Sequence, residues 1–240
     1  MGISMDSLYE PTCTGEYAFL RRLSESWGAH PLVMDVGAGV GLYAKLVRHL
    51  APEATVYAFE PHPKAFALLE EEARRSGFTA LNQGCGDTQG KMPLYDYASD
   101  EGSPVASVYQ EVIEGLWRAR STSTVVPIIT LDRFLHDHGI DRVTLLKVDT
   151  EGHELRVLQG ARSSITNHLI DVIQFEFNVM NIFSRTYMKD FYDLLPNYDF
   201  YRILPGGVVP LGPYRATLHE IFAFQNIVAV RDGCASVFQN

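Results

Sequence analysis

Short apolar runs alternate with stretches of helical spacing along most of the chain. The runs at residues 32–36, 55–59, 79–83, 125–129, 143–148 and 171–177 have the length and composition of buried strands. Residues 42–50, 63–76 and 131–138 have the apolar spacing of helices that pack on a sheet. Because alternation of this kind builds parallel sheets, we expect an α/β fold with helices on both faces of one sheet.

The two ends and one internal stretch depart from this alternation. Residues 15–27 predict an amphipathic helix, within an N-terminal cap of residues 1–30 placed over the substrate mouth. Residues 96–124 lack periodicity, which is typical either of a substrate lid or of a variable surface excursion. Residues 200–204 and 226–230 are expected to pair as an antiparallel ribbon around 205–207. We therefore predict one domain, 1–240, with a Rossmann-like, seven-stranded, mostly parallel sheet.

The turn after the first strand points to a nucleotide cofactor. Asp35 ends the strand and leads into Gly37-Ala38-Gly39, where the absence of side chains at the glycines lets a ligand approach the backbone. A dinucleotide turn reads G-x-G-x-x-G, whereas the third glycine here, Gly41, comes one residue early. An acid beside the turn suits the cationic sulfonium and amino acid tail of S-adenosylmethionine better than a pyrophosphate. A tight strand-to-helix connection without a ligand is the structural alternative.

A second acid follows the second strand. Glu60, followed by Pro61, stands about 20 residues beyond the glycine turn, where an acid accepts hydrogen bonds from a ribose diol. A free diol occurs in both S-adenosylmethionine and NAD, but the 2′-phosphate of NADP would be repelled. After the third strand, Asp87 is a candidate acceptor for an adenine amine and Gly86 would allow close approach, although a plain turn explains both residues equally well.

Polar side chains gather after the fourth core strand and the strand that follows it. Asp149, Glu151 and His153 are candidate general bases, because ligands of open α/β sheets lie at the carboxyl ends of strands. Glu176 and Asn178 would join Asp149 in an oxygen-rich corner if the two strands are neighbours.

That corner has three interpretations. Asp149, Glu176 and Asn178 offer the oxygen ligands that Mg²⁺ or Mn²⁺ prefers. Alternatively the acids work as bases without a metal. In a third interpretation, Lys147 forms a buried ion pair with Asp149 or Glu176 that only balances charge.

Composition narrows the class of protein. With 240 residues, of which 46% are hydrophobic, the chain can bury one sizeable core. A net charge of −9 argues against a nucleic-acid partner, because phosphate binding needs clustered Lys and Arg. The three cysteines, Cys13, Cys85 and Cys234, lie far apart, which indicates a reducing compartment and no zinc site. With no signal peptide or membrane span in the sequence, we expect a soluble, cytoplasmic protein.

Four motifs resemble the FkbM-type methyltransferases, a family of S-adenosylmethionine-dependent enzymes with the class I methyltransferase fold. They are residues 35–43, residues 58–61, the turn at 86–90 and the Lys-x-Asp-x-Glu-Gly stretch within 147–161. The resemblance implies O-methylation of a hydroxyl on a sugar, glycoside, polyketide or other secondary metabolite. His153 stands where the family more often has an aromatic residue.

Other functions stay open on the sequence alone. A nicotinamide-dependent oxidoreductase is disfavoured by the early Gly41, and a non-catalytic scaffold subunit is disfavoured because Asp35, the glycines and Glu60 are all present. The partner we expect is a small-molecule or glycosidic hydroxyl acceptor, and the N-terminal helix is a candidate element of a homodimer.

Overall fold

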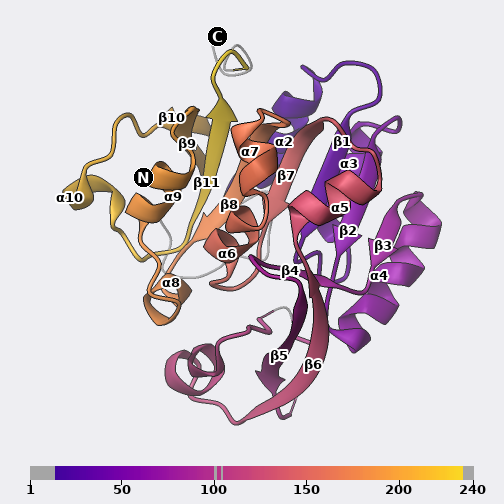
Figure 1. Ribbon diagram of the computed structural model, residues 1–240, viewed down its shortest axis with the longest axis vertical. Helices are drawn as coiled ribbons and strands as arrows, with labels where there is room; N and C mark the ends of the chain where they lie inside the picture. Colours follow the sequence, from indigo (N-terminus) through magenta and orange to yellow (C-terminus); the bar gives the residue numbers. More distant parts are fainter. Residues whose placement is uncertain (1–13, 100–101, 104, 235–240) are drawn as a thin grey trace.

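The computed structural model describes residues 14–99, 102–103 and 105–234, and these form two sheets flanked by helices (Figure 1). The main sheet has eight strands in the order β10-β9-β11-β8-β7-β1-β2-β3, and a smaller sheet has the order β4-β6-β5. The strands of the main sheet are β1 (Leu32–Val36), β2 (Thr55–Phe59), β3 (Thr79–Leu81), β7 (Val143–Val148), β8 (Ile170–Phe177), β9 (Tyr198–Leu204), β10 (Gly207–Pro210) and β11 (Gln225–Arg231).

The main sheet is parallel in its centre and antiparallel at one end. Strands β3, β2, β1, β7 and β8 run parallel to one another, whereas β11 is antiparallel to both β8 and β9, and β9 is antiparallel to β10. The expected mostly parallel sheet with a terminal antiparallel pair is confirmed. The strand count is eight instead of seven, because a short hairpin adds β10 at the edge.

Helices cover both faces of the main sheet. Two apolar clusters divide at the sheet, because alternate strand residues point to opposite faces: Met34 and Val36 belong to one cluster and Val33 to the other. The helices are α2 (Glu16–Ser24), α3 (Leu42–Leu50) and α4 (Pro63–Ser76) on one side, and α5 (Leu131–Asp137), α6 (Glu154–Gln159), α7 (Arg162–Thr166) and α9 (Met188–Leu194) on the other. Two further short helices, α8 (Met180–Phe183) and α10 (Ala216–His219), lie in connections.

Helix α4 begins and ends where the apolar spacing predicts, at residues 63 and 76. Pro63 stands in its first turn, and the His62 side chain accepts from the amide of Lys64. Gly77 ends the helix in the left-handed conformation, with φ of 75°. The signals at both ends are therefore local to the sequence.

The region expected to be irregular, 96–124, lies between the two strands of a long hairpin and includes only their ends. Strands β5 (Gly90–Tyr97) and β6 (Ser121–Ile129) pair antiparallel and extend away from the main sheet, below it in Figure 1. The short β4 (Gly84–Cys85) joins β6, so the third core strand ends at Leu81 and not at residue 83. The sequence prediction missed β5, whose exposed positions include Gly90 and Pro93. The link between the strands holds a π-helical turn, η1 (Val112–Leu116).

The two ends of the chain differ in part from expectation. Strand β11 pairs with β9, as predicted for 226–230 and 200–204, but the turn at 205–206 joins β9 to β10. Helix α2 buries Phe19, Leu20 and Leu23 against α3 and the β9–β10 edge of the sheet. Residues 1–13 of the predicted cap, with Cys13, lie outside the described residues. No helix in the part of the chain that the structure describes is long and apolar enough for a membrane span.

Candidate active site

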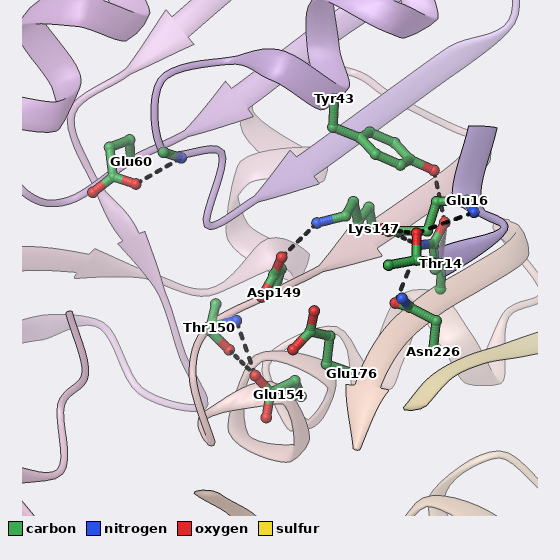
Figure 2. Close-up of polar contacts among 12 residues, drawn as sticks. Thr14, Glu16, Tyr43, Glu60, Lys147, Asp149, Thr150, Glu154, Glu176 and Asn226 are labelled. Atoms are coloured by element: carbon green, nitrogen blue, oxygen red, sulfur yellow. Dashed lines mark hydrogen bonds and ion pairs between the residues drawn. The ribbon is translucent and has the colours of Figure 1, made fainter. Parts of the chain in front are cut away.

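Acidic side chains meet at the carboxyl ends of β1, β2, β7 and β8 (Figure 2). Strands β7 and β8 are parallel neighbours with Val148 opposite Phe175, so Asp149 and Glu176 follow on adjacent strands. The two strands are therefore neighbours, as the predicted oxygen-rich corner requires.

Asp35 is a buried carboxylate that lacks a hydrogen-bond partner of good geometry. Its side chain is 0% exposed, and neither oxygen accepts such a bond from the described residues. Burial raises its pKa to about 6; the charge of Lys147 and, more weakly, the nearby Ala44 amide oppose this shift, and the charge of Asp149 adds to it. Because an unpaired buried carboxylate is costly, the position fits a ligand that brings a cationic donor.

The three glycines after Asp35 differ in what a β-carbon at each position would meet. A β-carbon on Gly37, with φ of +81°, would lie 1.7 Å from the carbonyl oxygen of Asp149, so this glycine permits contact between two loops of the protein. A β-carbon on Gly39, with φ of +53°, would meet nothing within 4 Å. On Gly41 it would lie 2.8 Å from Leu69 on α4. Of the two glycines expected to admit a ligand, Gly39 has the open side, whereas Gly37 is required by packing.

Neighbouring backbone groups hold the glycine loop in place. The amides of Gly37 and Ala38 both donate to the carbonyl of Phe59, at 3.0 and 2.9 Å. The Ala38 amide, in a predicted cofactor-binding position, is thus committed to the end of β2.

Glu60 connects the end of β2 to the glycine loop. Its Oε2 accepts from the amide of Gly39 at 2.9 Å, and its Oε1 accepts from the amide of His62 at 2.7 Å. Burial raises its pKa to about 7, although both amides favour the ionised form. Each carboxylate oxygen has a second lone pair, so two hydroxyls can still donate to it. Pro61 packs beside Gly84.

The predicted adenine-side pair is occupied by protein contacts. Asp87 pairs with Arg156 at 3.0 Å. A β-carbon on Gly160 would lie 2.0 Å from the carbonyl oxygen of Gly86, and the ring of His153 lies against Gly86 itself. The two glycines thus let the end of α6 pack on β4.

Lys147 and Asp149 form the ion pair that was one of the sequence interpretations. The Lys147 ammonium donates to Asp149 Oδ2 at 2.8 Å, and the two side chains are 8% and 27% exposed. Burial alone would lower the pKa of Lys147, but the charges of Asp149, Asp35 and Glu16 outweigh it and raise the pKa well above the usual value. The other carboxylate oxygen of Asp149 accepts no hydrogen bond from this lysine, and the Asp149 side chain is partly exposed to solvent.

Glu151 and Glu176 share the acidic corner with Asp149. Burial and the charge of Asp149 raise the pKa of both glutamates well above the usual value. Glu151 also has a left-handed backbone, with φ of 54°, which is strained for a residue with a side chain. Burial and the charge of Asp149 thus favour the neutral form of both glutamates.

Two of the three predicted metal ligands, Glu176 and Asn178, are hydrogen-bonded to each other. Asn178 donates its amide nitrogen to Glu176 Oε2 at 3.1 Å, while its oxygen accepts from the amide of Met180. Within the described ranges, no group of three or more His, Cys, Asp or Glu side chains is placed to hold a metal ion. The Mg²⁺ or Mn²⁺ site at Asp149, Glu176 and Asn178 stays a prediction.

His153 points toward the insertion. Its Nδ1 lies 3.2 Å from the hydroxyl of Tyr109, and burial lowers its pKa to about 4. The hydroxyl of Ser107 donates to the carbonyl of Glu151 at 2.8 Å. The predicted lid region is thus attached to the acidic corner.

The other end of the insertion is attached near the cofactor acids. Asp96 accepts hydrogen bonds from the amides of Gly102 and Ser103 and lies 3.7 Å from His62 Nε2. No periodic signal in the sequence predicts the contact with His62, because it joins segments that are far apart in the chain.

Comparisons with known proteins agree with this arrangement. A model of the methyltransferase FkbM domain matches residues 35–201. The chain is 30% identical over 155 residues to the hexuronic acid methyltransferase AglP of Haloferax volcanii, which covers 63% of this chain and 58% of that protein. It is 24% identical over 187 residues to the 2-O-methyltransferase NoeI of Sinorhizobium fredii, covering 74% and 76% respectively.

Two further comparisons bear on length and fold. Methyltransferase sdnD of Sordaria araneosa is 27% identical over 157 residues, covering 55% of this chain and 61% of that protein. The chain thus spans about three fifths of the length of sdnD and AglP. The N-terminal domain of human METTL16, solved in complex with SAH, matches 95% of this chain and 76% of its own at a TM-score of 0.51 and 9% identity, which supports the fold alone.

The matched region runs from the acid at the end of β1 into β9 and so includes the glycine loop, Glu60 and the Lys147–Glu151 stretch. This chain, which has the class I methyltransferase fold, belongs to the FkbM methyltransferase family.

Proposed function

We propose that the protein transfers the methyl group of S-adenosylmethionine to a hydroxyl of a sugar, glycoside, polyketide or other secondary metabolite. The observation that carries this proposal is the buried carboxylate of Asp35, whose two oxygens accept no hydrogen bond of good geometry from the described residues. A cationic ligand at that position removes the cost of the unpaired charge. A pyrophosphate there would increase it, which argues against a nicotinamide dinucleotide.

Three groups of this chain fit the cofactor. Asp35 would accept from its amino group, Gly39 leaves space beside the loop, and Glu60 would accept from its ribose hydroxyls through the lone pairs that the backbone leaves open. When bound, the cofactor supplies an electrophilic methyl group on a cationic sulfur.

Asp149 is the residue we assign to the proton. As the acceptor oxygen bonds to the methyl carbon, the carbon–sulfur bond would break with its electron pair left on the neutral thioether, and the hydroxyl proton would pass to the Asp149 carboxylate. Lys147 holds Oδ2 at 2.8 Å, so the other oxygen is directed to the acceptor. Glu151 and Glu176, whose neutral forms are favoured by burial and by the charge of Asp149, would instead hydrogen-bond to other acceptor oxygens.

His153 receives a supporting role in this proposal. With a pKa of about 4 it is a weak base at neutral pH, and its ring lies between Tyr109 and Gly86. We assign it to fixing the insertion over the site.

The acceptor class rests on the relatives. One is a hexuronic acid methyltransferase, one a 2-O-methyltransferase, and another a 31-O-demethyl-FK506 methyltransferase from Streptomyces tacrolimicus that is 28% identical over 156 residues. Sugars and a macrolide polyketide are therefore the first acceptors to try. The net charge of −9 supports these over nucleic acid.

The test is a methyl-transfer assay with radiolabelled S-adenosylmethionine and a panel of neutral sugars, uronic acids and hydroxylated macrolides. We expect label in at least one hydroxyl acceptor, and no label with an Asp35→Asn variant. Parallel reactions with added Mg²⁺ and with EDTA measure whether a metal contributes. A protein that binds the cofactor but labels nothing in the panel would count against the proposed acceptors, and one that does not bind it would overturn the proposal.

A further inference from the structure

A chain of partly buried polar contacts connects helix α2 to the acid at the end of β7 (Figure 2). Glu16 Oε1 accepts from Gln174 Nε2 at 2.7 Å, and Gln174 Oε1 accepts from the hydroxyl of Tyr43 at 2.7 Å. The Lys147 ammonium lies 5.0 Å from the centroid of the Tyr43 ring and donates to Asp149 at 2.8 Å. Four separate elements thus contribute to one contact chain.

The direction of these hydrogen bonds is set at Glu16. A carboxylate can only accept, so the amide nitrogen of Gln174 must face it and the amide oxygen must face Tyr43. Gln174 is 0% exposed, so water has little access to replace either contact. Tyr43 therefore has to donate its hydroxyl hydrogen to Gln174, which fixes the plane of its ring.

The position of the Lys147 ammonium depends on that ring. Several acids attract the ammonium from different elements, so charge alone does not select one of them. They are Glu16 on α2, Asp35 at the end of β1, Asp149 and Glu151 after β7, and Glu176 on β8. The face of the Tyr43 ring adds a cation–π contact on one side of the ammonium. That contact favours the place from which Lys147 reaches Asp149.

We propose that Glu16 is a positioning residue of the active site, which acts through Gln174 and Tyr43 to hold Lys147 against Asp149. The inference rests on the proposed function, in which Asp149 accepts the proton. Glu16 lies before residue 35, where the match to the family model begins. The site therefore draws on a helix that the family match does not include.

A double-mutant cycle tests whether Glu16 acts through Lys147. With the acceptor that the wild-type protein methylates best, we expect Glu16→Ala to lower kcat about tenfold, the factor that loss of one charge-assisted hydrogen bond produces. The KM for the acceptor and the affinity for S-adenosylhomocysteine should not change. In a Lys147→Met background, Glu16→Ala should have no further effect, because residues that act in series are not additive. Tyr43→Phe supplies a second cycle if Lys147→Met does not fold.

The matched control is Glu25→Gln, which removes an exposed acid at the C-terminal end of the same helix. We expect wild-type kcat for this variant. Independent, multiplicative losses in both cycles would overturn the inference, and so would an equal loss in Glu25→Gln or a Glu16→Ala effect confined to KM.

Failure of the proposed function has a different signature. If the wild-type protein methylates no acceptor, the same cycles are measured as urea unfolding midpoints. Non-additive midpoint shifts for Glu16 and Tyr43 would then support the contact chain, while additive shifts would overturn it.

Discussion

The two halves of the acidic edge use carboxylates in opposite ways. At the ends of β1 and β2, Asp35 accepts no hydrogen bond of good geometry from the described part of the chain, and Glu60 is held by two backbone amides. At the ends of β7 and β8, Asp149, Glu151 and Glu176 crowd around one lysine, and burial with the charge of Asp149 raises the pKa of both glutamates well above the usual value. Under the proposed function, the first half receives the cationic cofactor and the second half accepts a proton from the hydroxyl acceptor.

The halves also differ in how they are assembled. The half at the ends of β1 and β2, which we call the cofactor half, is built by two consecutive strand ends. Their loops hydrogen-bond to each other through Phe59 and Gly39. The half at the ends of β7 and β8, which we call the acceptor half, depends on segments far apart in the sequence. These include Tyr109 from the insertion and Glu16 from α2. Changes in the cofactor half should therefore affect binding, and changes in the acceptor half should affect turnover.

The largest separation of these effects is expected for Asp149→Asn. Loss of the general base should lower kcat by about 10³-fold, within the usual range for such groups. Affinity for S-adenosylhomocysteine should stay close to that of the wild type, because Asp149 belongs to the acceptor half. Steady-state kinetics and calorimetry check the two parts, and a large loss of cofactor affinity would erase the distinction between the halves.

The glycine pair sharpens the comparison within one loop. Gly37→Ala should destabilise the protein by about 3 kcal/mol or more, because its β-carbon would overlap the Asp149 carbonyl in a left-handed conformation. Gly39→Ala has space and should cost only about 1 kcal/mol for its backbone conformation. We expect Gly39→Ala to fold yet bind S-adenosylhomocysteine weakly, as measured by urea unfolding and calorimetry. Equal unfolding costs for the two variants would contradict the assignment of different causes.

Asp35→Asn should separate binding from stability. Affinity for S-adenosylhomocysteine should fall about 100-fold, because the amino group of this ligand loses a buried charged partner. The cofactor-free variant should be more stable than the wild type at pH 8, since the burial cost of a charge that accepts no hydrogen bond of good geometry is gone. Glu53→Gln, at an exposed acid before β2, serves as the control and should match the wild type in both measurements. A destabilised Asp35→Asn variant would indicate that Asp35 has a structural partner.

The stability of the cofactor-free protein should fall as pH rises from about 4 to 7. Asp35 and Glu60 keep their protons in the folded state up to about pH 6 and about pH 7, whereas the unfolded chain loses them near 3.8 and 4.5. Between these limits the folded state binds more protons, so rising pH favours unfolding. For Asp35 the effect is at most about 3 kcal/mol. Thermal melts at several pH values measure it, and the slope in this window should decrease in Asp35→Asn.

Much of the cofactor half could be predicted from the sequence. Strand ends and glycines are local signals, and they correctly place Asp35, Gly39 and Glu60 at one edge of the sheet. Gly37 was expected to let a ligand approach, whereas in the structure its missing β-carbon makes room for the Asp149 carbonyl. The local sequence pattern does not reveal this contact.

The acceptor half was predicted only in outline. The adjacency of Asp149 and Glu176 followed from strand order, but the roles of Tyr43 and Gln174 depend on pairing across the sheet that one sequence does not reveal. The ion pair of Asp87 with Arg156 could not be predicted for the same reason, because the two residues lie 69 positions apart in the sequence.

The most direct test of the central claim is a calorimetric titration of S-adenosylhomocysteine into the wild-type protein at pH 8, with NADH and a Glu60→Ala variant as comparisons. The account predicts micromolar binding of S-adenosylhomocysteine, weakened at least about tenfold in Glu60→Ala, and little binding of NADH. A preference for NADH, or equal binding by both proteins, would contradict it.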